Sequence, residues 1–312
     1  MACNPVDSRT FLLARASMAS ANQRYLSIAY FRCFLFSIRS NIHQKVNQMS
    51  AIIPGLSSMY AGNAGSVISR GVRATKSTNL WIVISGFFEP VFYLLSMGIG
   101  LGALVGEVES SGKLVPYAAF IAPALLAVSG MNGAIYDSTM NVFFKLNYGK
   151  IYQTMLTTSL GPLDVALGEI FLALLRGGLY ATGFLGVMQL FGLNLSWTAI
   201  LAIPAVIIIA FGFASIGMGI TSYMTRFQQL DLIQFFLLPM FLFSATFYPL
   251  SVYPGGVQVF IQALPLWHGV ELIRALTLGT FNAGHLWHLL YFVMMIIVGL
   301  IFTSRRLKKL FQ

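Results

Sequence analysis

Four ionisable side chains lie within long apolar stretches of the sequence, where a charge is costly. They are Glu89, Asp137, Glu169 and Arg176. Because a charge in hydrocarbon requires a partner, the simplest interpretation is structural: Arg176 is neutralised by Glu169 or Glu89 and holds spans together. Two alternatives stay open. The same groups could line a polar route for a substrate, or they could relay protons as in a secondary transporter.

Nucleotide chemistry is not predicted for this chain. Residues 106–114 come closest to a phosphate-binding loop, but they have one residue too many between the glycines. Leu114 also replaces the Ser or Thr that would bind Mg²⁺. The sequence has no nucleophile-elbow or HExxH pattern. We therefore expect no catalytic residues and no cofactor in this chain.

Three histidines, His268, His285 and His288, come late in the sequence, and Glu271 lies among them. One interpretation is a metal site. The other is an aromatic belt at the membrane surface, because Trp and Tyr residues accompany the histidines and imidazoles tolerate the same interface. The second interpretation is favoured, and no metal site is expected.

The chain that positions these residues is too apolar for a soluble domain. Hydrophobic residues make up 57% of it and charged residues 9%, whereas globular domains have about 25% charged residues. Six apolar segments each approach or exceed the roughly 20 residues that a helix needs to cross hydrocarbon. Lipid offers no partner for free backbone groups, so we predict an all-α polytopic membrane protein with six transmembrane helices. The expected spans are about 80–105, 117–141, 163–191, 198–222, 231–250 and 286–303.

The basic residues orient the chain in the membrane. With the N-terminus inside, sixteen of the 19 Lys and Arg residues are cytoplasmic, and only Lys113 and Arg274 lie outside. Cytoplasmic loops carry such an excess, so a multi-pass protein of the cell (inner) membrane with both termini in the cytoplasm is expected. These residues flank spans instead of forming a patch, so the net charge of +10 indicates contact with anionic membrane lipid, not nucleic acid.

Two segments outside the spans are unusually apolar. Residues 141–162, on the cytoplasmic side, interleave aromatic side chains with Lys145 and Lys150. Such a patch marks a docking surface for a partner, or else an amphipathic helix resting on lipid. Residues 251–285, on the outer side, are too apolar for a solvated loop. Each piece of them is too short to span, so two re-entrant or interfacial helices are predicted.

The expected domain organisation is an N-terminal cytoplasmic extension over 1–65, which is amphipathic or dispensable, followed by the transmembrane domain over 66–312. Residues 66–79 are expected to form an amphipathic helix that leads into the first span. Within the spans, small residues about four apart predict close helix contacts. These are Gly98, Gly102 and Gly106 in the first span, Gly178, Thr182 and Gly186 in the third, and Ser215 with Gly219 in the fourth.

Several long motifs resemble the ABC-2 family of transport permeases, most closely the nodulation-protein-J-like, lipooligosaccharide-exporter type. They occur in family order over about residues 66–312. The motifs are FFEPVFYLLSMGIGLGALV (87–105), YAAFIAPALLAVSGMNGAIYDSTMNVFFKLNYGKIY (117–152), LGPLDVALGEI with LLRGG (160–178), and FSATFYPLSVYPGGVQVFIQALPLWHGVELIRALTLG (243–279).

The resemblance implies the permease subunit of an ATP-driven exporter, with ATP and Mg bound by two copies of a separate ABC ATPase subunit and the permease paired as a homodimer. The cargo implied is an amphiphile: a lipooligosaccharide, a polysaccharide-lipid or a drug-like molecule. An ion-coupled secondary transporter and a non-transporting membrane scaffold remain alternatives. By the same resemblance, coupling to the ATPase falls to Phe143, Phe144, Lys145, Tyr148, Lys150 and Tyr152, and an outer re-entrant gate to Tyr248, Pro249, Pro254, Pro265, His268, Glu271 and Arg274.

Overall fold

The computed structural model describes residues 60–76, 88–110, 112–193 and 196–311 of the chain. All of them belong to one compact unit, Met59–Gln312. The predictions for the N-terminal extension up to residue 59, and for the start of the first span before Phe88, lie outside the described residues.

Five helices among the described residues are long and apolar enough to cross a membrane, and a shorter apolar helix precedes the last of them. This architecture confirms the predicted helical membrane fold. The sixth span stays a prediction, because the shorter helix ends at Phe243, well before the expected end near 250. The five are Phe88–Val105, Tyr117–Tyr148, Pro162–Leu190, Trp197–Thr221 and Ala283–Leu310, and the shorter one is Phe227–Phe243.

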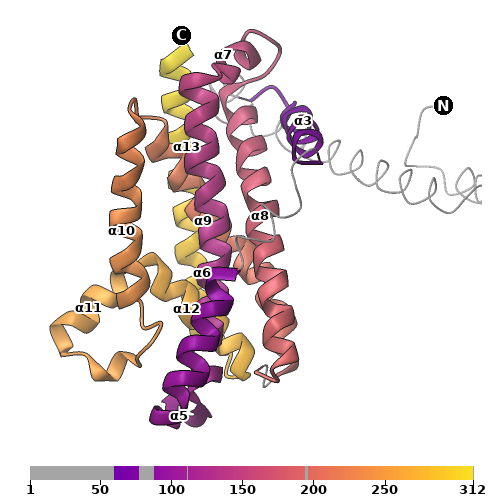
Figure 1. Cartoon of the computed structure of the whole chain (residues 1–312). Coiled ribbons are helices and arrows are strands. Elements are labelled where there is room, and N and C mark those ends of the chain that lie inside the picture. Colours follow the sequence, from indigo (N-terminus) through magenta and orange to yellow (C-terminus); the bar gives the residue numbers. More distant parts are fainter. Residues whose placement is uncertain (1–59, 77–87, 111, 194–195, 312) are drawn as a thin grey trace, which may run out of the picture. The chain divides into compact units, whose positions relative to one another are not determined.

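Figure 1 shows these helices with the shorter elements that connect them. In chain order the elements are α3 (Ala64–Lys76), η1 (Leu94–Leu101), α5 (Gly102–Val105), β1 (Glu107–Ser110), β2 (Lys113–Pro116), α6 (Tyr117–Tyr136), η2 (Asp137–Asn141), η3 (Phe144–Tyr148), α7 (Ile151–Leu156), α8 (Pro162–Leu190), η4 (Trp197–Leu201), α9 (Ala202–Thr221), η5 (Phe227–Gln229), α10 (Leu230–Phe243), η6 (Leu250–Val252), α11 (Gly255–Ala263), α12 (Pro265–Leu278), η7 (Ala283–His285) and α13 (Leu286–Phe311).

A short hairpin between the first two long helices is the one sheet among the described residues, and it was not expected. β1 pairs antiparallel with β2, with Ser110 opposite Lys113 across a two-residue loop. The loop needs a positive φ, which Gly112 supplies at 75° without a steric penalty. The Lys113 ammonium donates to the carbonyl of Leu278 at 3.4 Å, so the hairpin places a positive charge at the C-terminus of α12.

The helix that begins with α6 is enclosed by the rest of the protein. Of its most apolar 18 residues 89% are buried, compared with 17% in both the first and the last spans. α6 packs against α8, α9, α12 and the first span. At its crossing with α8, a Cβ on Gly133 would lie 2.9 Å from the Cα of Gly177, so two glycines allow the two backbones to touch.

This crossing uses a different face of α8 from the expected one. A Cβ on Gly178 or Gly186 would meet little or nothing, whereas one on Gly177 would lie 2.8 Å from the carbonyl oxygen of Gly130. The prediction of a small-residue ridge was therefore wrong by one residue on α8. It was right on α9, where Ser215 lies against Gly299 of α13, and where a Cβ on Gly219 would lie 2.7 Å from the Phe302 ring.

The two ends of the bundle differ in charge. Figure 1 shows α7 and the C-terminal end of α13 at one end, and α5 and α11 at the other. We call the first the cation-rich end. Its basic residues include Lys145, Lys150, Arg226, Arg305, Arg306, Lys308 and Lys309, whereas the elements at the opposite end carry Lys113 and Arg274.

The glycine contact between α6 and α8 predicts a test of this packing. Gly177→Ala should lower the midpoint of thermal unfolding in detergent by several degrees, because overpacking a close contact costs about 1–3 kcal/mol. Gly186→Ala, on the same helix but with open space around its Cβ, is the matched control and should not lower the midpoint. Equal effects of the two substitutions would contradict the assigned crossing.

Candidate functional site

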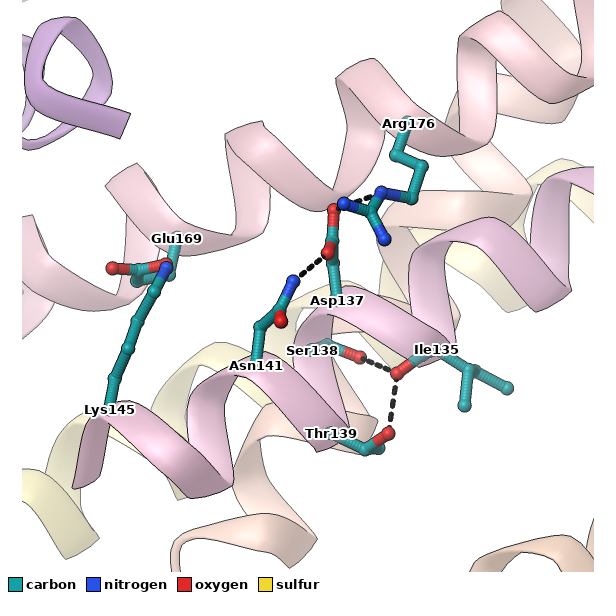
Figure 2. A network of polar contacts seen from close by, with 8 residues as sticks. All are labelled: Ile135, Asp137, Ser138, Thr139, Asn141, Lys145, Glu169 and Arg176. Carbon is teal, nitrogen blue, oxygen red and sulfur yellow. Dashed lines mark hydrogen bonds and ion pairs between the residues drawn. The ribbon is translucent and has the colours of Figure 1, made fainter. Parts of the chain in front are cut away.

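The C-terminal half of the second long helix contains two π-helical turns, η2 and η3. Such turns inside an α-helix are frequent at functional sites. The Ile135 carbonyl accepts hydrogen bonds from the Thr139 hydroxyl at 2.7 Å and from the Ser138 hydroxyl at 3.3 Å, so both hydroxyls bond back to the preceding turn (Figure 2). Through these turns the helix continues to Tyr148, beyond the expected end at 141.

The first ion pair of this region joins η2 to α8. The Arg176 Nε lies 3.0 Å from Asp137 Oδ2, and both side chains are largely buried. Asn141, one turn along the helix, donates to the other carboxylate oxygen of Asp137 (Figure 2). The expected pairing of Arg176 with Glu169 or Glu89 was therefore wrong. Glu169 and Arg176 were predicted to share one face of α8, which favoured a pair between them. Their partners Lys145 and Asp137 instead come from the helix that begins with α6.

Glu169 is the centre of a second charge cluster. Its carboxylate lies 2.5 Å from Lys145 Nζ and 3.6 Å from the Arg70 guanidinium, and its side chain is only 3% exposed. Lys145 belongs to η3 and Arg70 to α3, so one buried carboxylate connects three elements. Removing a partner would leave a buried charge uncompensated.

The N-terminus of α8 fixes the segment before α3. Asp164 is fully buried, and its carboxylate accepts from the backbone N–H groups of Ala61 (2.8 Å), Asn63 (3.1 Å) and Gly161 (2.9 Å). A carboxylate near a helix N-terminus is favourable in its own right. The sequence analysis missed Asp164, although Pro162 at the first position and an acid at the third are a typical helix start that could have indicated it.

The residues expected to contact an ATPase divide into two groups. Phe143 and Tyr152 have 0% exposure and offer no free surface, and the partly exposed Lys145 is held by Glu169, so these three hold the segment in place. Burial and the nearby Glu169 carboxylate raise the pKa of the Tyr152 phenol well above its usual value, so it stays neutral. Tyr148 and Lys150 are exposed, and Lys150 adopts a left-handed conformation with φ 48° that begins α7.

An exposed group of three rings remains, which we call the aromatic surface: Phe144, Tyr148 and Phe227. The Phe144 ring lies 5.4 Å from the Tyr148 ring and 5.9 Å from the Phe227 ring. Phe143 lies beneath them, 6.0 Å from Tyr148. Phe227 belongs to η5 and was not among the predicted residues, because no sequence pattern indicated that the loop between α9 and α10 meets η3.

Residues 251–285 contain two short helices, α11 and α12, over the range expected for the re-entrant pair. Their depth in a bilayer stays a prediction. Arg274 of α12 is buried: it pairs with Glu271 at 2.7 Å, donates to the Ala245 carbonyl at 2.9 Å, and lies 4.1 Å from the centre of the Phe120 ring. It therefore connects α12 to α6 and to the chain that follows α10, where Ala245 has φ 54°.

The other predicted gate residues lie in the chain from the end of α10 through α12. Pro249, Pro254 and Pro265 mark the starts of η6, α11 and α12, and Tyr248 is exposed. His268 of α12 contacts His288 of α13 with 2.7 Å between their Nδ1 atoms. In the described part of the chain, no three His, Cys, Asp or Glu residues are arranged to hold a metal.

Glu89 lies apart from both ion-pair clusters. It lines a cavity between the first span, α6 and α10, together with Asn132 and Gln234. The four intramembrane charges predicted from the sequence thus occupy three places: the Asp137–Arg176 pair, the Glu169 cluster and this cavity.

Comparison with known proteins decides the class of molecule that carries these features. The model of the ABC-2 type transporter family matches residues 64–278, from the first residue of α3 to the last residue of α12. The chain belongs to the ABC-2 type transporter family. It is therefore a multi-pass membrane subunit of the transporter kind, not an enzyme, and the family implies an ABC ATPase partner in general.

Similar curated proteins are all named nodulation protein J. The one from Rhizobium leguminosarum bv. viciae is 30% identical over 263 residues, which cover 82% of this chain and 100% of the relative. The one from Sinorhizobium fredii (strain NBRC 101917 / NGR234) is 31% identical over 226 residues, or 72% of this chain and 84% of the relative. The one from Bradyrhizobium diazoefficiens is 30% identical over 237 residues, or 74% and 88%.

The buried pair between η2 and α8 predicts a non-additive mutant cycle. Arg176→Met should destabilise the protein by about 3–5 kcal/mol, because it leaves the Asp137 carboxylate buried without its cation. Adding Asp137→Asn removes that charge while keeping an acceptor for Asn141, so the double variant should recover most of the loss. Thermal unfolding in detergent measures both. A double variant as unstable as the sum of the two single variants would contradict the pairing.

Proposed function

We propose that the chain is the permease subunit of an ATP-driven exporter that moves an amphiphile out of the cytoplasm or inner leaflet. The observation that carries the proposal is the aromatic surface, since rings exposed at one end of a membrane bundle fit a docking site for a partner. Membership of the ABC-2 family supports an ABC ATPase as that partner. The chain's sequence has no phosphate-binding loop, so ATP and Mg²⁺ would bind the partner subunit.

The orientation follows from the charges at the two ends. The cation-rich end carries seven of the basic residues named above, and loops rich in Lys and Arg stay in the cytoplasm. The aromatic surface lies on the same end, since η3 and η5 meet there: the Asn147 side chain donates to the Met224 carbonyl at 3.3 Å. A cytoplasmic ATPase would then be able to reach the aromatic surface. We also propose that the protein lies in the cell (inner) membrane with both chain termini in the cytoplasm.

Coupling would pass through the ion-pair clusters. A force on the aromatic surface acts on η3, which Lys145 connects to α8 through Glu169. Arg176 makes a second connection to α8 from η2. Closure of two ATPase subunits on ATP would therefore move α6 and α8 as one body, and a rocking of two half-transporters between inward-open and outward-open states follows.

Two permease copies are proposed, because one set of helices encloses little cross-section for a bulky amphiphile. The first span and α10 both present apolar faces with large exposed side chains, including Phe92 (62%), Phe235 (70%) and Phe236 (71%), which a second copy or lipid would cover. A lipooligosaccharide, a polysaccharide-lipid or a drug-like molecule remains the proposed cargo. The relatives are named for nodulation, and their names specify no cargo.

The test is ATP hydrolysis by the chain reconstituted with the ABC ATPase subunit co-expressed with it. Phe144→Ser with Tyr148→Ser should weaken binding of the ATPase at least about tenfold, because hot-spot aromatic residues contribute 2 kcal/mol or more. Vanadate-sensitive ATP hydrolysis stimulated by the permease should fall accordingly.

Trp197→Ser is the matched control, since Trp197 is 90% exposed but belongs to η4, at the other end of α9 from the aromatic surface. It should leave ATPase binding unchanged. If the double variant binds the ATPase with an affinity within twofold of that of the unmodified protein, the aromatic surface is not the docking site. Transport that stops when the proton gradient is dissipated, with ATP still present, would favour the secondary transporter instead.

A further inference from the structure

A cavity of about 80 Å³ lies between the first span, α6 and α10. Three polar side chains line it, one from each helix: Glu89, Asn132 and Gln234. The rest of the lining is apolar or aromatic and consists of Pro90, Tyr93, Leu125, Val128, Met131, Leu237, Leu238 and Phe241.

The three polar side chains differ from the other polar groups described above because no protein group forms a hydrogen bond with them. Within the described part of the chain, the Glu89 carboxylate and the Asn132 and Gln234 amides make no hydrogen bond or ion pair. By contrast, the charged side chains deeper in the bundle are paired, as with Asp137 and Arg176. Glu89 and Gln234 are exposed on the surface of the described chain, and Asn132 is half-buried. Lipid offers such groups no hydrogen-bond partner, and polar residues within membrane spans are usually functional. Three such groups converging on one space indicate a bound ligand.

The donors and acceptors at this site define the chemistry of that ligand. Glu89 is the single charged residue of the lining, so the cavity repels an anion such as a phosphate. A carboxylate accepts hydrogen bonds, whereas each amide both donates and accepts. An ammonium group has no acceptor to offer the amide donors, whereas a hydroxyl group has both a donor and acceptors. The mixed set therefore fits hydroxyl groups best.

The size of the cavity limits how much of a molecule it holds. A water molecule needs roughly 10–15 Å³ measured in the same way, so the space accommodates the equivalent of about five to eight waters. That is enough for one hydroxylated group of a few heavy atoms, not for a whole oligosaccharide. The apolar side chains beside the polar three would contact the first carbons of an acyl or alkyl chain.

We propose that this cavity binds the hydroxyl-bearing group at the junction between the polar head and the apolar chain of the exported amphiphile, and that Glu89 excludes anionic heads. The inference rests on the proposed export function for its biological meaning. Glu89 accepts from the hydroxyl groups, Asn132 and Gln234 complete the hydrogen bonds, and the three helices supply one group each.

The test uses the full chain in phosphatidylcholine nanodiscs, without ATP or a partner subunit. Three photoreactive probes share an octyl chain with a diazirine next to the head: an octyl glucoside, an octylammonium and an octyl phosphate. After irradiation, mass spectrometry locates the adducts. The glucoside should label the peptides containing Glu89, Asn132 and Gln234 at least fivefold more than the other two probes do.

Substitutions then separate the roles of the side chains. Gln234→Leu should reduce glucoside labelling of the cavity at least fivefold, whereas Gln228→Leu, an exposed amide of η5 outside the cavity, should not change it. Glu89→Gln keeps the shape and removes the charge, so labelling by octyl phosphate should rise. Glu109→Gln, in the β1 strand, is the matched carboxylate control.

The result that overturns the proposal is glucoside labelling of the cavity no stronger than that of lipid-facing peptides, or unchanged labelling in Gln234→Leu and Glu89→Gln. Preference for octylammonium would also overturn it, because the amides would then not take part. A variant that fails to fold is recognised by its elution profile, and the probe comparison on the unmodified chain still decides. Because no ATP is used, failure here is separate from failure of the ATPase experiment.

Discussion

The enclosure of one helix, from Tyr117 to Tyr148, is the constraint on which the rest of the structure depends. A helix surrounded by protein inside a membrane has neither water nor lipid head groups for its polar side chains, so its neighbours must supply the partners. α8 supplies Arg176 for Asp137 and Glu169 for Lys145. It can do so because Gly133 and Gly177 let the two backbones approach until short side-chain distances become possible.

The same constraint gives the two ends of the bundle different tasks. At the cation-rich end, buried ion pairs connect η2 and η3 to α8 and α3, so the exposed rings of the aromatic surface stand on a rigid support. At the opposite end, Arg274 and Lys113 connect α12 to the chain after α10 and to the β1–β2 hairpin. Between these connected ends lies the cavity beside Glu89, whose polar side chains have no partner in the described part of the chain, and we assign the ligand to it.

The sequence predicted what depends on composition and local pattern. Long apolar segments indicated the helices, and the turn residues around Pro254 and Pro265 indicated two short helices within residues 251–285. It did not predict what depends on tertiary contact. Periodicity placed Glu169 and Arg176 on one face but could not show that Lys145 and Asp137 reach them across a helix interface. Aromatic content marked residues 141–162, but composition alone cannot separate the buried Phe143 from the exposed Phe144. The small-residue contact on α8 was also predicted one residue away from its true position, because composition does not show which helix face meets α6.

The central claim is that the cation-rich end, with its aromatic surface, faces the cytoplasm. The direct measurement is labelling of single cysteines by a membrane-impermeant maleimide, in a chain whose Cys3 and Cys33 are replaced by serine. With Tyr148→Cys, intact cells should show no labelling until the membrane is permeabilised, whereas Trp197→Cys should be labelled in intact cells. Labelling of Tyr148→Cys from the outside, with Trp197→Cys protected, would contradict the account, because no cytoplasmic ATPase could then reach these rings.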